Sequence, residues 1–210
     1  GVGVSTRRAA TLPVSFFRRP ADEVARDLVG CVVVSRAGGN VVAARIVETE
    51  AYLGLDDPAS HAWQGRRTAG NASIYGPPGT WYVYRSYGMH WCANLVCGGP
   101  AAGAAVLLRA LEPLEGLEVM RTRRGNMADR LLASGPGRLT VALAITRALD
   151  GQAMRASPVT VHARDAVPML ATTRRVGISR AVEWPLRYAE QGSPWASRAR
   201  VTAPRARTRG

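Results

Sequence analysis

Three residues in one short run have the types and spacing needed for acid–base chemistry. The segment 46–52 is predicted to be a β-strand, and alternate side chains of a strand share a face, so Glu48, Glu50 and Tyr52 face the same way. Two carboxylates on one buried face repel each other, and burial raises the pKa of at least one, as in a general base. The alternative is a solvated face on which neither carboxylate has a role. The pattern does not distinguish Glu48 from Glu50.

A second segment, residues 81–91, concentrates aromatic side chains around a predicted turn. Tyr82 and Tyr84 alternate onto one face of a strand, and Tyr87 precedes Gly88 at the tip. Aromatic side chains at the edge of a core usually pack, and we expect this for Tyr82. A tyrosine at an exposed tip has little packing reason to be there, and in a basic protein it can act as a wedge that enters a base step of DNA.

The charge of the chain indicates what kind of partner these residues meet. Its 210 residues include 28 basic and 15 acidic side chains, a net charge of +13. Residues 1–10 and 196–210 hold seven of the arginines and no acid, yet the rest of the chain still has six more basic than acidic side chains. Because each neutralised phosphate releases counterions, this surplus favours a nucleic acid as partner.

The cysteine and histidine residues predict neither a disulfide framework nor a metal site. There is no Cys-x-x-Cys pair, and the histidines lack the spacing of metal ligands, so we expect no metal and no cofactor. No apolar run approaches the roughly 18 residues that span a bilayer, and no secretory signal follows the first arginines, so we expect a cytoplasmic protein without a membrane partner. The cysteine and histidine residues considered above are Cys31, Cys92, Cys97, His61, His90 and His162.

The elements that position these residues alternate between short strands and short helices. Acidic residues after Pro20, followed by Gly30, predict a helix between them, and turn residues at 37–40 between two β-branched runs predict a hairpin. Residues 53–80 form a long connection, and loops of more than about 15 residues are usually functional or disordered. The remaining pattern predicts strands at 81–85, 91–96, 104–111, 159–164 and 174–178, and helices at 112–124 and 139–149. Together they indicate one α+β domain built on a mostly antiparallel sheet.

These motifs closely resemble those of the alkyladenine (3-methyladenine) DNA glycosylase family. The similarity runs in collinear order from about residue 14 to about residue 198. Each motif is short, but their order makes the set highly specific. The matching segments are Glu48–Gly54, His61, Tyr82–Tyr84, Tyr87–His90, Asn94, Leu107–Pro113, Ser134–Pro136 and Gly192–Trp195.

The resemblance implies a fold and a set of catalytic residues. It implies an α+β fold, a single glycosylase domain at residues 12–201 with a curved, mostly antiparallel β-sheet flanked by helices. Residues 1–11 and 202–210 would be flexible basic termini. By the same resemblance, Glu50 activates the attacking water, Arg109 lies beside that water and the target phosphate, and the main-chain carbonyl of Val176 holds the same water.

The resemblance also assigns residues to the base pocket and to the tip. The pocket residues it implies are Tyr52, His61, Tyr84 and Asn94, with Asn94 excluding guanine through a clash with its exocyclic amine. Tyr87, accompanied at the tip by Met89, would fill the gap that a flipped base leaves in the stack.

The implied activity is base-excision repair of double-stranded DNA that contains alkylated purines. The enzyme would flip 3-methyladenine or 7-methylguanine, and also hypoxanthine or ethenoadenine, and hydrolyse the N-glycosidic bond with a Glu-activated water, acting as a monomer. The sequence contains no lysine. Bifunctional glycosylases form a Schiff base through an amine, usually that of lysine, and only the terminal amine is available in this sequence. We therefore expect a monofunctional enzyme that leaves an abasic site.

The long loop departs from the family pattern. Where the family often has Thr-Pro-Arg-Asn, this chain has residues 68–71 as Thr-Ala-Gly-Asn, so Gly70 replaces an arginine. Arg66 and Arg67 are candidates to supply the missing phosphate contact.

Two other functions are compatible with parts of the pattern. A non-catalytic module that recognises damaged DNA would bind in a salt-sensitive way without turnover. A formyltransferase-like domain that acts on RNA would prefer RNA over DNA.

Overall fold

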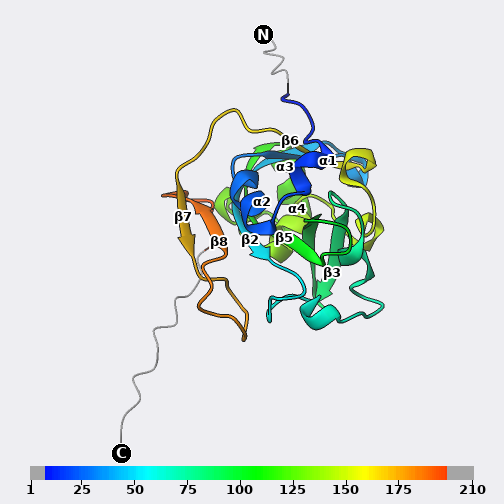
Figure 1. The fold of residues 1–210 in the computed structure, drawn as a ribbon. Coiled ribbons are helices and arrows are strands. Elements are labelled where there is room, and N and C mark those ends of the chain that lie inside the picture. Colours follow the sequence, from blue (N-terminus) through cyan, green and yellow to red (C-terminus); the bar gives the residue numbers. More distant parts are fainter. Residues whose placement is uncertain (1–7, 198–210) are drawn as a thin grey trace, which may run out of the picture.

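An eight-stranded antiparallel sheet is the frame of the molecule (Figure 1). The computed structural model describes residues 8–197. The strand order is β3-β4-β5-β2-β1-β6, and β8 pairs with both β2 and β7, so β8 and β3 lie on opposite sides of β2 and β5 in Figure 1. The strands are β1 (Val32–Ser35), β2 (Val42–Tyr52), β3 (Trp81–Ser86), β4 (His90–Cys97), β5 (Ala104–Glu115), β6 (Val159–His162), β7 (Leu170–Thr173) and β8 (Arg187–Glu190).

Short helices and 3₁₀ turns connect the strands. No helix within residues 8–197 is long and apolar enough to cross a membrane. The α-helices are α1 (Val14–Phe17), α2 (Ala21–Leu28), α3 (Leu117–Arg124) and α4 (Pro136–Ala142). The 3₁₀ turns are η1 (Ala37–Gly39), η2 (Trp63–Gly65), η3 (Ala72–Tyr75), η4 (Asp129–Leu131), η5 (Arg147–Leu149) and η6 (Met154–Ala156).

The two faces of the sheet have different neighbours. On one face, Trp81 and Val83 of β3 join the main core with residues of α2 and α4. On the other face, Tyr82 of the same strand belongs to a small apolar cluster with Ala62 and Ile74, which come from the long connection after β2. This follows from the alternation of side chains along a strand. The second face is therefore the one that the long connection covers.

Strand β2 is the central element of the site. It pairs with β5 along most of its length, with β1 at residues 42–45 and with β8 at Glu48–Glu50. The hydroxyl of Thr49 donates to the Ala25 carbonyl of α2 at 2.7 Å, so Thr49 faces the helix and its neighbours face the other way. The carboxylates thus lie in a strand that is paired on both sides, where little backbone movement is possible.

Most of the predicted framework is confirmed. The fold is α+β on a curled antiparallel sheet, with the predicted helix after Pro20 and the hairpin of β1 and β2. The strands on either side of the aromatic tip, β3 and β4, also form a hairpin.

The predicted helix at 112–124 is wrong in its first part. Strand β5 continues to Glu115, because Pro113 and Glu115 pair with Ala44 and Ala43 of β2. Gly116, with φ of 74°, turns the chain, and α3 begins at Leu117. The helical spacing of the apolar residues Leu117 and Met120 belongs to α3, whereas Leu114, one step before them, lies in the strand.

The predicted helix at 139–149 is displaced, and the predicted strand at 174–178 is not formed. Helix α4 ends at Ala142, Ala144 takes a positive φ of 54°, and only a 3₁₀ turn follows. Residues 174–178 form an irregular loop whose polar groups bind side chains rather than a neighbouring strand. The strands in this region are β7 and β8, on either side of the loop.

The predicted flexible termini fall largely outside the described residues. Residues 1–7 and 198–210 are not described. Thr11 forms an isolated bridge with His162 of β6. The proposed boundaries of the domain stay a prediction.

Candidate active site

A cavity of about 720 Å³ opens between the second face of the sheet and two loops, residues 53–66 and 176–180. Its volume lies within the range of roughly 300–1,000 Å³ that is usual for small-molecule sites. Seven of the nine residues predicted from the sequence line it: Tyr52, His61, Tyr84, Tyr87, Asn94, Arg109 and Val176. Glu50 lies directly behind this lining, and Met89 is not among the lining residues.

Glu50 is fully buried and is held by three donors. Its Oε1 accepts the hydroxyl of Tyr52 at 3.0 Å and lies 3.4 Å from Nη1 of Arg109, and its Oε2 accepts the backbone N–H of Val176 at 2.6 Å. Burial raises the pKa of Glu50 above its usual value, and the charge of Glu48 adds to this, although the three donors oppose the rise. Glu50 is therefore a carboxylate that gains a proton more readily than an exposed glutamate.

Glu48 is equally buried but has a different set of partners. Its carboxylate accepts hydrogen bonds from Nε of Arg109 at 3.0 Å, Nε of Arg187 at 2.8 Å and both the N–H and hydroxyl of Ser197 at 2.7 Å. Burial acts to raise the pKa of Glu48, but the bonds and charges of these partners outweigh it and hold the pKa below its usual value. Glu48 therefore stays ionised and anchors the arginines.

A β-bulge directs Arg109 at both carboxylates. In the pairing of β2 with β5, Glu48 lies opposite Ala110 and Thr49 lies opposite Leu108, so Arg109 has no partner in the register. An extra residue of this kind bends the strand and changes the direction of its side chain. The guanidinium, only 8% exposed, contacts both carboxylates, and their charges raise its pKa against the opposing effect of burial.

Three aromatic rings form one wall of the cavity. The rings of His61 and Tyr84 meet edge to face at 4.4 Å, and those of Tyr82 and Tyr84 lie 5.4 Å apart. Nδ1 of His61 is hydrogen-bonded to the hydroxyl of Tyr82 at 2.7 Å. The pKa of His61 lies below its usual value, because the ring is partly desolvated against the aromatic wall and the charge of Arg66 lies nearby, although the residue as a whole is exposed; this favours the neutral ring at neutral pH.

Asn94 lies in β4 opposite Tyr82 and is 4% exposed. Its Nδ2 donates to the carbonyl of Tyr82 at 3.2 Å and approaches that of Cys92 at 3.5 Å. The amide is therefore fixed in direction and gives the cavity a rigid polar wall.

The tip between β3 and β4 projects into solvent. Tyr87 is 92% exposed and Met89 is 71% exposed, which is unusual for large apolar side chains. Tyr87 has a φ of 50° and Gly88 a φ of 64°, so two successive residues in the left-handed region make the tip narrow. The structure brings Tyr87 to the rim of the cavity.

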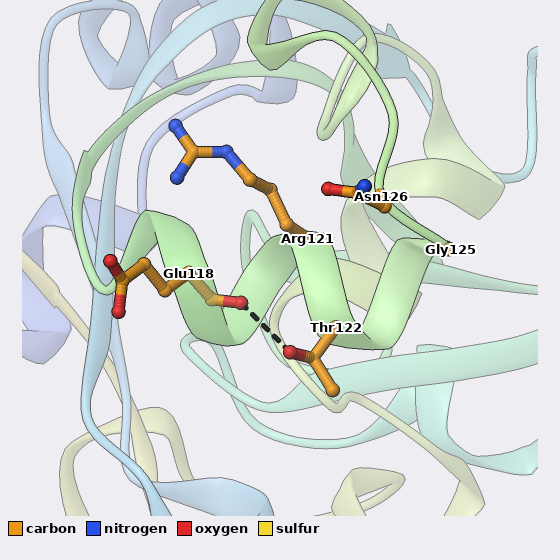
Figure 2. Close-up of a pocket in the computed structure, with 5 residues that line it drawn as sticks. All are labelled: Glu118, Arg121, Thr122, Gly125 and Asn126. Atoms are coloured by element: carbon orange, nitrogen blue, oxygen red, sulfur yellow. Dashed lines mark hydrogen bonds between the residues drawn. The ribbon is translucent and has the colours of Figure 1, made fainter.

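A second, smaller pocket of about 360 Å³ lies along α3 and the turn that follows it (Figure 2). The hydroxyl of Thr122 donates to the carbonyl of Glu118 at 3.0 Å, the dashed line in Figure 2. Arg121 pairs with Asp129 at 2.8 Å. These groups already have partners, and the pocket shares no lining residue with the larger cavity. Its lining residues are Glu118, Arg121, Thr122, Gly125 and Asn126.

Several polar partners of the site were not predicted from the sequence. Arg187 and Ser197 hold Glu48, and Asp57 binds Arg175, the residue next to Val176. Arg187, Ser197 and Arg175 lie far from β2 in the sequence, and Asp57 lies in a loop without periodicity, so the sequence pattern does not link them to the carboxylates. The only available signal was the position of Asp57 in a loop rich in turn residues. Among residues 8–197, no cluster of three or more His, Cys, Asp or Glu side chains could hold a metal ion.

Comparison with known proteins identifies the family. The family model described as methylpurine-DNA glycosylase matches residues 15–194. The chain belongs to the methylpurine-DNA glycosylase family. It is 50% identical over 188 residues to a protein of Agrobacterium fabrum, covering 89% of this chain and 92% of that protein. It is 49% identical over 189 residues to one of Rhizobium meliloti, covering 90% and 97%.

A relative from Methanoculleus marisnigri is 47% identical over 193 residues, covering 90% of this glycosylase and 99% of the relative. All three proteins carry the words 3-methyladenine DNA glycosylase in their names. The chain is thus a DNA glycosylase, an enzyme of DNA repair whose substrate is DNA.

Proposed function

We propose that this glycosylase excises alkylated purines from double-stranded DNA by hydrolysis. The observation that carries the proposal is the buried Glu50 carboxylate, whose pKa burial raises, behind an aromatic cavity of a strongly basic protein. Such a carboxylate is suited to take a proton from water. The proposed bases are 3-methyladenine and 7-methylguanine, with hypoxanthine and ethenoadenine as weaker substrates.

Base recognition relies on the aromatic wall. A base must leave the stack to reach the cavity, which costs a few kcal/mol, less for a damaged base. Alkylation at N3 or N7 makes the purine cationic, and the faces of Tyr52 and Tyr84 attract a cation by about 0.5–2 kcal/mol per site. Because His61 is neutral, it does not repel that cation. Asn94, fixed by the carbonyl of Tyr82, would clash with the exocyclic amine of normal guanine.

Bond cleavage uses a water molecule as the nucleophile. Glu50 takes one proton as the water oxygen bonds to C1′ of the sugar, the bond from C1′ to the purine nitrogen breaks, and its electron pair leaves with the base. Arg109 would stabilise the phosphate side of the sugar. Val176, whose N–H already binds Glu50, would hold the same water with its carbonyl.

DNA binding would use the tip and the arginines of the rim. Tyr87, with Met89 beside it, would fill the gap left by the flipped base. Arg66, Arg85 and Arg180 line the cavity, are exposed, and form no ion pair within residues 8–197. They are free to neutralise phosphates. We propose that Arg66 makes the phosphate contact of the family's loop arginine, whose position Gly70 occupies in this chain.

The proposed enzyme is monofunctional. A Schiff base needs an amine, and the chain has no lysine side chain. The product would therefore be an intact strand with an abasic site. We propose that the enzyme works as a monomer on chromosomal DNA in the cytoplasm.

The proposal is tested with a duplex oligonucleotide that carries one 7-methylguanine. We expect the purified protein to release the free base and to leave strands that break only after alkali. Strand breaks without alkali would contradict the monofunctional mechanism. Tight, salt-sensitive binding without release of the base would indicate a damage-binding module, and a preference for RNA competitor would exclude a DNA repair role.

A further inference from the structure

Asp57 and Arg175 form an ion pair whose side chains are both 0% exposed. The guanidinium donates from Nη1 to Oδ2 at 2.5 Å and from Nη2 to Oδ1 at 2.9 Å, a two-point geometry. A buried pair of this kind is costly to break, because the remaining charge has no counterion. The charge of Arg175 is therefore balanced by one carboxylate.

The pair joins three segments of the site. Nη1 of Arg175 also donates to the carbonyl of Ala51 at the end of β2, at 3.1 Å. The Asp57 carboxylate accepts the N–H groups of Leu53 and Ala59, each at 3.0 Å, and so shapes the start of the long connection. The next residue after Arg175 is Val176, which binds Glu50.

Arg175 also lies against the back of the base pocket. Its guanidinium carbon is 4.8 Å from the centre of the Tyr52 ring. Tyr52 lines the cavity, whereas Arg175 does not. The guanidinium thus covers the part of the Tyr52 ring that faces away from the cavity. A cation in this position competes for the same π-electrons that would attract a cationic base.

We propose that Asp57 is a specificity-determining residue that acts through Arg175 and Tyr52. By balancing the charge of Arg175, its carboxylate keeps the Tyr52 ring attractive to a cationic purine, and so sets the preference for cationic over neutral lesions. This inference rests on the proposed function. Asp57 is a positioning residue, because it touches neither the base nor the water.

The test compares single-turnover excision of 7-methylguanine, which is cationic, with that of hypoxanthine, which is neutral, in matched duplexes. Asp57→Asn leaves Arg175 unbalanced and lowers the cationic-to-neutral rate ratio about tenfold, the size of roughly one cation–aromatic contact. Arg175→Gln leaves Asp57 unbalanced and raises the ratio. The double variant removes both charges and brings the ratio back to within about threefold of wild type.

The control is Asp56→Asn, which removes the same charge from the exposed neighbour and leaves the ratio unchanged. Structural damage to the loop would persist or grow in the double variant, so the return of the ratio in that variant separates the effect of charge from structural damage. If Asp57→Asn does not fold by circular dichroism, a higher ratio in Arg175→Gln than in the double variant still supports the inference. Equal ratios in all folded variants overturn the inference alone, whereas wild-type protein that releases neither base overturns the proposed function as well.

Discussion

Glu48 and Glu50 lie two residues apart on one face of β2, yet their identical carboxylates have different electrostatic surroundings. Both side chains are 0% exposed and both contact Arg109. Glu48 has a second arginine and two further donors, so its pKa is lowered, whereas Glu50 shares one arginine at 3.4 Å and its pKa is raised. The difference shows that burial alone does not make a catalytic carboxylate. The number and charge of the donors decide which of two buried carboxylates anchors and which can accept a proton.

The largest expected effect is on the rate of catalysis when Glu50 is changed, and it sharpens the comparison of the two carboxylates. Glu50→Gln should slow single-turnover excision of 7-methylguanine by about 10²–10⁴-fold, since the amide cannot take a proton from water. Its stability in urea should fall by less than that of Glu48→Gln, because Arg109 keeps its bond to Glu48 and only one donor to residue 50 loses its acceptor. A variant that keeps a near-wild-type rate would show that Glu50 is not the base.

The second largest expected effect is on the stability of the protein when Glu48 is changed. Glu48→Gln removes the fully buried carboxylate that the buried Arg109 and the half-buried Arg187 share, so we expect a loss of about 3–5 kcal/mol in the free energy of unfolding. Urea denaturation followed by tryptophan fluorescence measures it, with Glu50→Gln as the matched control. The comparison breaks down if both variants lose the same amount.

The pH dependence should separate activity from folding. Glu50 must be ionised to act, so excision falls as the pH drops through its raised pKa. The lowered pKa of Glu48 means that its contribution to stability is complete above the unfolded pKa and is lost only as the pH falls through the lower, folded value. We therefore expect a window of mildly acidic pH in which the protein is folded but slow. Loss of rate and of circular dichroism at the same pH would rule this window out.

The smallest expected effect concerns one donor to Glu50. Tyr52→Phe keeps the ring that faces the cavity but removes the hydroxyl bond of 3.0 Å. The pKa of Glu50 should rise further and move the acid limb of the rate profile upward by about one pH unit, the value of one hydrogen bond to a charged group. An acid limb at the wild-type position would mean that this bond does not act on Glu50.

The sequence predicts the shared face of Glu48 and Glu50 because strand alternation is a local property. It does not distinguish them, because the groups that do so come from far along the chain: Val176 is 126 residues from Glu50, and Ser197 is 149 residues from Glu48. The bulge at Arg109 depends on the register of two strands, which no single segment encodes.

The loop at 174–178 was predicted as a strand for a related reason. Its β-branched residues suit a strand, but its partners in the structure are side chains, Asp57 for Arg175 and Glu50 for Val176. The family resemblance, rather than periodicity, was the source of the pocket residues, and the structure brings them to one cavity.

The central claim is that their surroundings give Glu48 and Glu50 different protonation behaviour, and NMR titration of the two side-chain carboxyl carbons tests it most directly. The signals can be assigned by their loss in Glu48→Gln and Glu50→Gln. We predict that, as the pH is lowered, Glu50 gains its proton above the usual range for glutamate and Glu48 only below it. If Glu48 takes up its proton first, or if both titrate together in the usual range, the account of which carboxylate activates water is contradicted.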